Sequence, residues 1–348
     1  MTDMMRALVF EGPNRMNLRQ IPRPRPGPGE VLIRVHATAI CGTDIRIFTG
    51  RKTREIRHGH PIGHECAGTV AAVGAGVTGY TSGEPVAVCV VVSCGQCEYC
   101  RADRENLCDT RYTLGYATDG SFAEYMLIPA LAVSRGNLFH LPPQIPMEMA
   151  PLLEPIACCL NGQHEMGLGQ DKGVKDGRPQ SLLIFGAGPI GLIHLMLAKA
   201  KGVRPITVVE PVAHRRELAG RFGADEVVSP DQFVVAARFD AAILAVGVPE
   251  LVNVALRAVK KTGRISLFAG FSGGATATID PNAVHYGQIT ISGASESRRR
   301  DFAEAMSLVQ RGIIDPALLL THRFSLDQYE QAFRVAGDGT AVKVIFEI

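Results

Sequence analysis

The sequence predicts an α/β protein of two domains, a barrel-like β domain and a doubly wound parallel sheet. A chain of 348 residues is too long for one ordinary hydrophobic core. Short strands separated by glycine and proline fill the amino-terminal part, as they do in β-barrels. After about Pro155, strands alternate with helices, which is typical of a parallel sheet covered on both faces.

The strands of the first region are predicted from apolar, β-branched stretches bounded by glycine and proline. They are Met5–Phe10, Glu30–Ile40, Gly68–Val73 and Pro85–Val92. The last fifty residues return to a mixed pattern, with helices predicted at 301–310 and 326–335 and strands at 319–324 and 342–346. Because this end of the chain lacks the strand–helix alternation, we expect it to complete the first domain.

The middle region carries the alternating pattern. Predicted strands cover residues 181–185, 205–210, 240–246, 264–268 and 289–293, and predicted helices cover 189–201, 213–222 and 250–260. Pro189 falls near the first turn of its helix, where proline is tolerated. The stretch from Leu182 to Ala198 is apolar, but it is shorter than the ~20 residues of a membrane span. Glycines, a proline and a histidine also interrupt it, so we interpret it as a buried strand and helix.

The composition indicates which binding partners and which cellular compartment to expect. A formal net charge of +2 gives no reason to expect nucleic acid or a membrane surface as a partner. The chain contains nine cysteines, an odd number, and shows no secretion signal. That pattern favours metal binding over disulfides, and we expect a soluble cytoplasmic protein.

Four cysteines have the spacing of a structural metal site. Cys94, Cys97, Cys100 and Cys108 are separated by two, two and seven residues. Thiolates at such short spacing converge on one tetrahedral ion, and four of them leave no open position for substrate. An iron–sulfur cluster also uses four cysteines, but its common spacings differ. The sequence therefore predicts a structural zinc site.

A second set of residues has the chemistry of a catalytic zinc site. Cys41 is followed by Thr43, His64 is followed by Glu65, and Glu154 lies in the apolar stretch 150–160. A buried carboxylate is costly unless a cation accompanies it. Thiolate, imidazole and carboxylate together hold catalytic zinc when one coordination position stays open.

These residues carry a family resemblance. The signature GHE-x2-G-x5-G-x2-V spans residues 63–77, and the chain resembles the zinc-dependent medium-chain dehydrogenases/reductases, the alcohol dehydrogenase superfamily. It is most similar to the branch of sorbitol, threonine and polyol-phosphate dehydrogenases. The resemblance implies a GroES-like, zinc-bearing catalytic domain at residues 1–154 and 293–348. It implies a Rossmann NAD-binding domain at residues 155–292.

The resemblance also implies roles for the candidate residues. Cys41 and His64 would ligate the catalytic zinc, Glu65 and Glu154 would supply carboxylates, and Thr43 would relay the proton of the alcohol. Either glutamate can be the direct ligand in this family. Many relatives carry histidine five residues after the zinc cysteine, but here that residue is Arg46, which cannot be deprotonated in a protein. Arg46 would then face an anionic substrate or be a solvated surface residue.

The dinucleotide turn is predicted where a glycine pattern follows a strand and opens a helix. That turn consists of Gly186, Gly188, Pro189, Ile190 and Gly191. A similar pattern at residues 74–79 is followed by no helix and is interpreted as a β-turn. Glu210 ends the second strand, where a carboxylate binds the ribose and favours NAD over NADP. Val246 is expected near the nicotinamide ribose, and Arg215 either meets a phosphate or lies on an exposed helix face.

The predicted function is the transfer of hydride between NAD and a secondary alcohol. The substrate would be a polyol or a sugar-derived alcohol, including phosphorylated or acidic forms, or an amino alcohol. Two alternatives remain at this point. One is a zinc-containing reductase of aldehydes or ketones that uses NADPH, and the other is a non-enzymatic NAD-binding relative. The expected partner is a small alcohol or ketone, and by resemblance we expect a homodimer or homotetramer.

Overall fold

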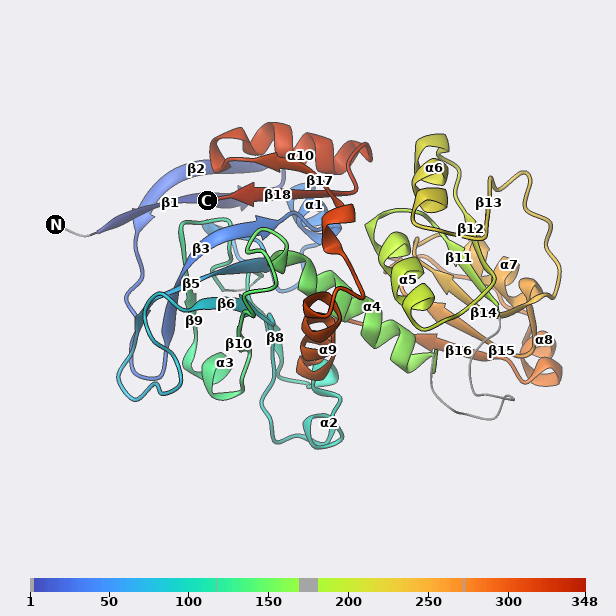
Figure 1. Cartoon of the computed structure of the whole chain (residues 1–348), viewed down its shortest axis with the longest axis horizontal. Helices are drawn as coiled ribbons and strands as arrows, with labels where there is room; N and C mark the ends of the chain where they lie inside the picture. The colour runs from blue at the N-terminus through green and yellow to red at the C-terminus, as the bar shows by residue number, and fades with distance from the viewer. Residues whose placement is uncertain (1–2, 117, 169–180, 272) are drawn as a thin grey trace. The chain divides into compact units, whose positions relative to one another are not determined.

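The structure is a computed structural model that describes residues 3–116, 118–168, 181–271 and 273–348 (Figure 1). The chain divides into two compact units. Unit 1 comprises Met1–Ala157 and Ser297–Ile348, and unit 2 comprises Cys158–Glu296. Within the described part of the chain, no helix is long and apolar enough to cross a membrane.

A seven-stranded sheet forms the centre of unit 1. Its strands follow the order β10-β6-β5-β3-β18-β17, and β9 also pairs with β3. Their bounds are β3 Val31–Ala39, β5 Glu65–Val73, β6 Pro85–Val88, β9 Tyr125–Ile128, β10 Leu138–His140, β17 Leu320–Phe324 and β18 Lys343–Glu347. The carboxy-terminal strand β18 thus lies beside β3 (Figure 1), and the last part of the chain completes unit 1.

The register of the central strands brings distant residues together. Ala39 at the end of β3 pairs with Glu65 at the start of β5. On its other side, Ala39 pairs with Ile345 of β18. The end of β3 and the beginnings of β5 and β18 therefore lie next to one another at the same end of these three neighbouring strands.

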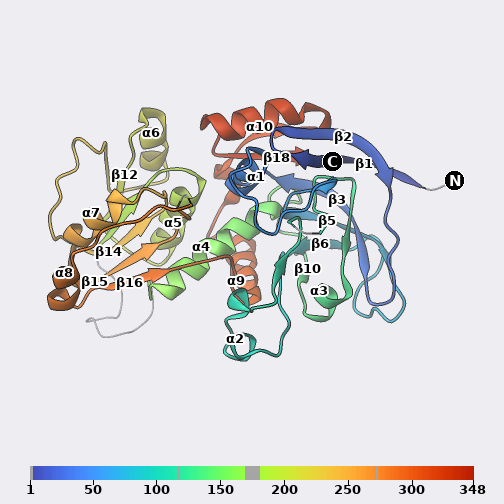
Figure 2. The same ribbon diagram turned by 180° about the vertical axis from the view of Figure 1, so that it is seen from behind.

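A second, three-stranded sheet and two helices cover a core at this end of unit 1. The sheet contains β1 (Met4–Gly12), β2 (Arg15–Pro22) and β4 (His60–Pro61). Helices α1 (Gly42–Phe48) and α10 (Tyr329–Asp338) pack together through Phe48 and Phe333, whose ring centres are 5.4 Å apart, and they lie side by side in Figure 2.

The remaining elements of unit 1 are short. They are β7 Val91–Val92, α2 Glu98–Arg101, η1 Glu105–Leu107, β8 Tyr112–Thr113, α3 Ala130–Ser134, η2 Ala150–Leu152, α9 Arg299–Gln310, η3 Pro316–Leu318 and η4 Leu326–Gln328. Helix α4 (Leu153–Glu165) begins in unit 1 and continues into unit 2.

Unit 2 is a parallel six-stranded sheet in the order β13-β12-β11-β14-β15-β16. Its strands are β11 Leu182–Phe185, β12 Ile206–Val209, β13 Glu226–Val228, β14 Phe239–Leu244, β15 Val259–Leu267 and β16 Thr290–Gly293. Its helices are α5 Pro189–Ala200, α6 Ala213–Arg221, α7 Glu250–Ala258 and α8 Pro281–Gly287. The predicted alternation of strands and helices is confirmed, although the short strand β13 and the helix α8 were not predicted.

Candidate metal centres and dinucleotide turn

Three candidate ligands converge at the edge of the central sheet of unit 1. Cys41 lies at the beginning of α1, just after β3, and His64 precedes Glu65 at the beginning of β5. The sulfur of Cys41, a ring nitrogen of His64 and a carboxylate oxygen of Glu65 all lie within 4.8 Å of one another. These are the donor types that hold zinc, and the distances allow them to share one ion.

Asp44 supports this group, although the sequence analysis did not single it out. It is fully buried, and its Oδ2 accepts a hydrogen bond from the Cys41 amide at 2.8 Å. Its Oδ1 lies 3.2 Å from Nδ1 of His64. A carboxylate behind a histidine fixes the ring so that the other ring nitrogen can face a metal. Burial lowers the pKa of His64, but Tyr116, Asp44 and Cys41 raise it, and its net pKa lies well above the ordinary value.

Lys343 forms a buried ion pair with Glu65. Its Nζ lies 2.7 Å from Oε1 of Glu65 and also donates to the carbonyl of Ile40 at 3.2 Å. Burial lowers the pKa of Lys343, whereas the charges of Glu65, Cys41 and Glu154 raise it, and the net shift is upward. The carboxylate of Glu65 therefore already has one cationic partner within the protein.

Glu154 is almost fully buried in the first turn of α4 and does not belong to the 4.8 Å group among the described residues. The charge of Glu154 nevertheless acts on two neighbours of the group, because it contributes to the raised pKa of both Lys343 and Tyr116. The ring of Tyr116 contacts that of His64, with centres 5.3 Å apart. Tyr116 is a second neighbour of the group that the sequence analysis missed.

Thr43 is engaged by Arg46, one turn further along α1. A guanidinium nitrogen of Arg46 donates to Oγ1 of Thr43 at 2.8 Å. Arginine has no acceptor, so Thr43 cannot pass a proton to it. Arg46 is therefore no substitute for a relay histidine.

The four cysteines of the short-spaced cluster also converge. Their sulfur atoms lie within 4.8 Å of one another, with 3.5 Å between Cys97 and Cys100. Backbone amides point at the sulfurs, including Cys97 N to Cys94 at 3.4 Å and Cys94 N to Cys108 at 3.4 Å. The amides of Gln96 and Cys97 lower the pKa of Cys94 to about 6. This favours the thiolate, which is the form that binds zinc.

The cysteine cluster is attached to α9 through a partly buried ion pair. Arg299 donates to Oε1 of Glu105 from both its backbone amide and Nε at 2.9 Å. Glu105 lies between Cys100 and Cys108, and its side chain is only 5% exposed. Burial raises the pKa of Glu105, but the hydrogen bonds of Arg299 lower it, and the net shift is downward.

The glycine turn of unit 2 has the local geometry of a dinucleotide site. Gly186 follows β11 with φ of +97°, a conformation that favours glycine. A Cβ on Gly191 would lie only 1.9 Å from the Gly186 carbonyl oxygen, so the start of α5 packs directly on the turn. Pro189 begins α5, and Val246 after β14 lies against Gly186. Gly188 and Ile190 complete the turn.

Glu210 faces this turn from the end of β12. Its Oε2 accepts from Ala187 N at 2.7 Å and its Oε1 from Val212 N at 2.9 Å. Each carboxylate oxygen has a second lone pair with which it can accept a hydrogen bond from a hydroxyl. Arg216 donates to the backbone carbonyl of Glu210, and Arg215 is half-buried near the start of α6.

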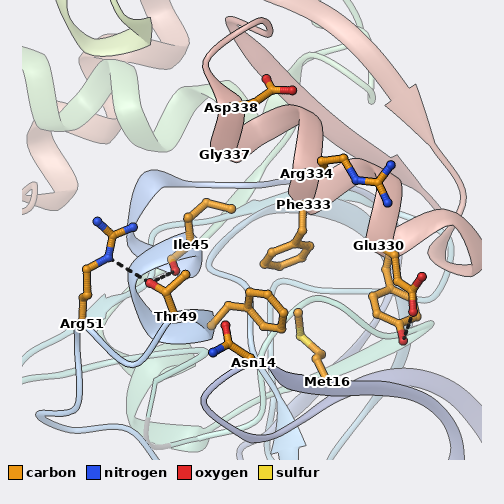
Figure 3. Close-up of a pocket in the computed structure, with 12 residues that line it drawn as sticks. Asn14, Met16, Ile45, Thr49, Arg51, Glu330, Phe333, Arg334, Gly337 and Asp338 are labelled. Atoms are coloured by element: carbon orange, nitrogen blue, oxygen red, sulfur yellow. Dashed lines mark hydrogen bonds between the residues drawn. The ribbon is translucent and has the colours of Figure 1, made fainter.

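A hollow of about 610 Å³ lies elsewhere on unit 1, between α1 and α10 (Figure 3). Its floor is apolar, with Met16, Ile45 and Phe333, and Arg51 and Arg334 stand at its ends. Its lining includes none of the candidate metal ligands.

Comparison with known proteins agrees with the description of both units. Residues 27–137 match the family described as alcohol dehydrogenase GroES-like domain, and residues 189–311 match the family described as zinc-binding dehydrogenase. The L-threonine 3-dehydrogenase of Pyrococcus horikoshii is 35% identical over 360 aligned positions, which cover 99% of each chain.

Two solved structures share the fold over nearly the whole chain. A protein of Sinorhizobium meliloti, named as a zinc-binding dehydrogenase and bound to NADP, is 28% identical with a TM-score of 0.89, and the match covers 99% of this chain and 100% of that one. An alcohol dehydrogenase of Escherichia coli, complexed with NADH, is 26% identical with a TM-score of 0.87 and 99% coverage of both chains. The predicted combination of a GroES-like and a Rossmann fold is confirmed. The chain belongs to the zinc-dependent alcohol dehydrogenases of the medium-chain dehydrogenase/reductase superfamily and is an NAD(P)-dependent oxidoreductase acting on alcohols.

Proposed function

We propose that this dehydrogenase uses NAD to oxidise a secondary alcohol of a polyol, a sugar-derived alcohol or an amino alcohol. The single observation that carries the proposal is the convergence of Cys41, His64 and Glu65, backed by Asp44. The similarity to threonine dehydrogenases supports an alcohol with polar neighbours rather than a simple alkanol.

The catalytic zinc is proposed to bind Cys41 and His64, with Glu65 or Glu154 as carboxylate ligand. The structural zinc is proposed to bind Cys94, Cys97, Cys100 and Cys108. The first set mixes sulfur, nitrogen and oxygen donors and leaves a coordination position for substrate, whereas four thiolates close the shell. Two zinc ions per chain are the expected content.

Zinc held by these residues would act as a Lewis acid that lowers the pKa of the substrate hydroxyl, and bound NAD would provide the hydride acceptor. The chain's own residues orient the substrate and move its proton. Asp44 holds His64 in one orientation, and Lys343 fixes the carboxylate of Glu65. We propose that Thr43 accepts the proton of the substrate hydroxyl and releases its own to solvent, because Arg46 already donates to it and cannot accept.

The dinucleotide is proposed to bind at the turn of unit 2 that contains Gly186, Gly188, Pro189, Ile190 and Gly191. Glu210 is proposed to accept hydrogen bonds from the ribose hydroxyls and to repel a 2′-phosphate, so that NAD is preferred over NADP. Val246 would contact the nicotinamide ribose, and Arg215 would lie beside the adenine ribose. In this assignment residues 155–292 form the NAD-binding domain, and residues 1–154 and 293–348 form the catalytic domain.

A cytoplasmic homodimer or homotetramer is proposed as the working form. Within the described part of the chain, none of the nine cysteines forms a disulfide, which fits a reducing compartment. Strand β16 ends the six-stranded sheet, and beside it lies an apolar groove of about 270 Å³ lined by Phe271, Ile279 and Ile291, among others. An open strand edge next to an apolar groove suits pairing with a second copy. Light scattering of the purified enzyme measures the mass of the oligomer and so distinguishes a dimer from a tetramer.

The proposal is tested by metal content together with NADH formation on a panel of alcohols. The wild type is expected to hold two zinc ions and to reduce NAD with at least one polyol, sugar acid or amino alcohol. Cys41→Ser should remove one zinc and all activity, and Cys97→Ser should remove the other zinc. A fully zinc-loaded wild type that reduces NAD with none of these alcohols would contradict the proposal.

A further inference from the structure

The segment after the catalytic cysteine concentrates positive charge. Residues 46–57 contain five cations, namely Arg46, Arg51, Lys52, Arg54 and Arg57, and one carboxylate, Glu55. The whole chain has a formal net charge of only +2. The surplus of cations is therefore a local feature of the segment that runs from α1 into the loop before β4.

Three of these cations are engaged away from the metal group. Arg54 pairs with Glu55 at 3.5 Å, and its side chain is 91% exposed. Arg57 pairs with Asp119 at 2.6 Å. Arg51 donates to Thr49 and lines the hollow beside α1 (Figure 3). These interactions account for Glu55, the carboxylate of the segment.

Arg46 and Lys52 approach the metal group through its immediate neighbours. Arg46 donates to Thr43, which is two residues from Cys41. The Lys52 ammonium lies 4.6 Å from the centre of the Tyr116 ring, which in turn contacts His64. Arg46 thus contacts a residue close in sequence to Cys41, and Lys52 contacts the aromatic neighbour of His64.

Arg46 retains binding capacity at this position. A guanidinium has five N–H donors, and the recorded side-chain hydrogen bond to Thr43 involves one nitrogen. Within the described residues no carboxylate lies at ion-pair distance from it. Arginine binds planar carboxylates and phosphates through two parallel hydrogen bonds, whereas a neutral hydroxyl satisfies only one donor.

We propose that Arg46 and Lys52 form an anion subsite, and that the preferred substrate is an alcohol carrying a phosphate or carboxylate group. This inference rests on the proposed function, because it places the anion beside the reacting hydroxyl. Arg46 would contact the anionic group directly, and Lys52 would add attraction from the Tyr116 side. Both residues would be specificity determinants rather than participants in hydride transfer.

Matched substrate pairs test the subsite. Initial rates of NADH formation are compared for sorbitol and sorbitol 6-phosphate, and for sorbitol and gluconate. The anionic member of each comparison is expected to have at least roughly tenfold higher kcat/KM, and its KM should rise with salt. The phosphate and carboxylate arms identify which anion fits.

Variants then assign the preference to residues. Arg46→Gln should lower kcat/KM for the anionic substrate at least roughly tenfold more than for the neutral one. Lys52→Gln should act in the same direction with a smaller effect. Arg54→Gln is the matched control, because it removes a cation of the same segment that is exposed and paired with Glu55. It should leave the ratio of kcat/KM for the anionic substrate to kcat/KM for the neutral substrate unchanged.

Three outcomes would overturn the subsite. They are equal losses on neutral and anionic substrates in Arg46→Gln, an equal effect of Arg54→Gln, or a change confined to the KM for NAD, which would assign Arg46 to the cofactor's pyrophosphate. These outcomes differ from failure of the proposed function. In that case the zinc-loaded wild type would oxidise neither the neutral nor the anionic alcohols.

Discussion

Lys343 and Glu65 form a buried ion pair that joins the carboxy-terminal strand β18 to β5 at the proposed catalytic zinc. Their side chains are 6% and 0% exposed, and the two residues are separated by 278 positions in sequence. Glu65 begins β5 and Lys343 begins β18, and both strands flank β3. The carboxy-terminal strand thereby neutralises a carboxylate of the metal group, which no residue nearby in sequence does.

Removing Lys343 should therefore destabilise unit 1 strongly. Lys343→Met leaves the Glu65 carboxylate buried without its cation, and breaking a buried pair on one side costs about 3–5 kcal/mol. Urea unfolding of the zinc-free enzyme measures the loss, because zinc bound to Glu65 would itself compensate the buried charge. The control is the double variant Lys343→Met/Glu65→Gln, which removes both charges and should recover much of the stability. If the double variant is as unstable as the single one, the cost comes from packing and not from charge.

Arg299 should hold the cysteine cluster in its metal-binding form. Arg299→Ala leaves the buried Glu105 without its hydrogen-bonded cation, at a cost of about 1–3 kcal/mol. Release of zinc from the cluster to a chelator should be correspondingly faster. Arg300→Ala is the control, because the Arg300–Asp103 pair is about half-exposed and such a pair contributes at most about 1 kcal/mol. Equal zinc release in the two variants would contradict a role specific to Arg299.

The sequence predicted those parts of the site that lie close together along the chain. Cys94 and Cys108 are fourteen positions apart, so the spacing alone indicated their convergence. The glycine turn and Glu210 were recognisable because a strand, a turn and a helix follow one another directly. Lys343 had no such signal, since only the pairing of β18 with β3 brings it near Glu65. Long-range strand pairing is not contained in local periodicity.

Asp44 was missed for a different reason. A carboxylate in the first turn of a helix is common, because it accepts hydrogen bonds from free backbone amides there. Asp44 does accept from the Cys41 amide, and its approach to His64 depends on how β5 is placed. A residue that both caps a helix and orients a ligand looks, in sequence, like a helix cap alone.

Glu210 should control the choice between NAD and NADP. The wild type is expected to prefer NAD, and Glu210→Ser should raise kcat/KM for NADP relative to NAD by roughly tenfold or more, because a negative charge near the 2′-phosphate is removed. Initial rates at equal, low cofactor concentrations measure the ratio. Glu210→Gln is the control for folding, since it keeps an acceptor for one of the Ala187 and Val212 amides. Equal rates with both cofactors in the wild type would contradict the role of Glu210.

His194 should make unit 2 sensitive to acid. It is fully buried in α5, its Nε2 has no hydrogen-bond partner within the described chain, and burial lowers its pKa to about 3. The unfolded chain binds a proton near pH 6.5, while the folded unit resists it until about pH 3. Stability contributed by the neutral ring is therefore intact above pH 6.5 and declines toward pH 3 by about 1.4 kcal/mol per pH unit.

His194→Met should flatten that decline because it removes the buried base while keeping an apolar side chain of similar size. Thermal unfolding of the wild type and the variant between pH 7 and about pH 4.5 gives the comparison, and the two melting temperatures should diverge as the pH falls. His285→Met is the matched control in the same unit, since His285 is exposed. Parallel pH profiles for the wild type and His194→Met would show that acid destabilisation arises elsewhere, for example from carboxylates such as Glu105 whose ion pairs break on protonation.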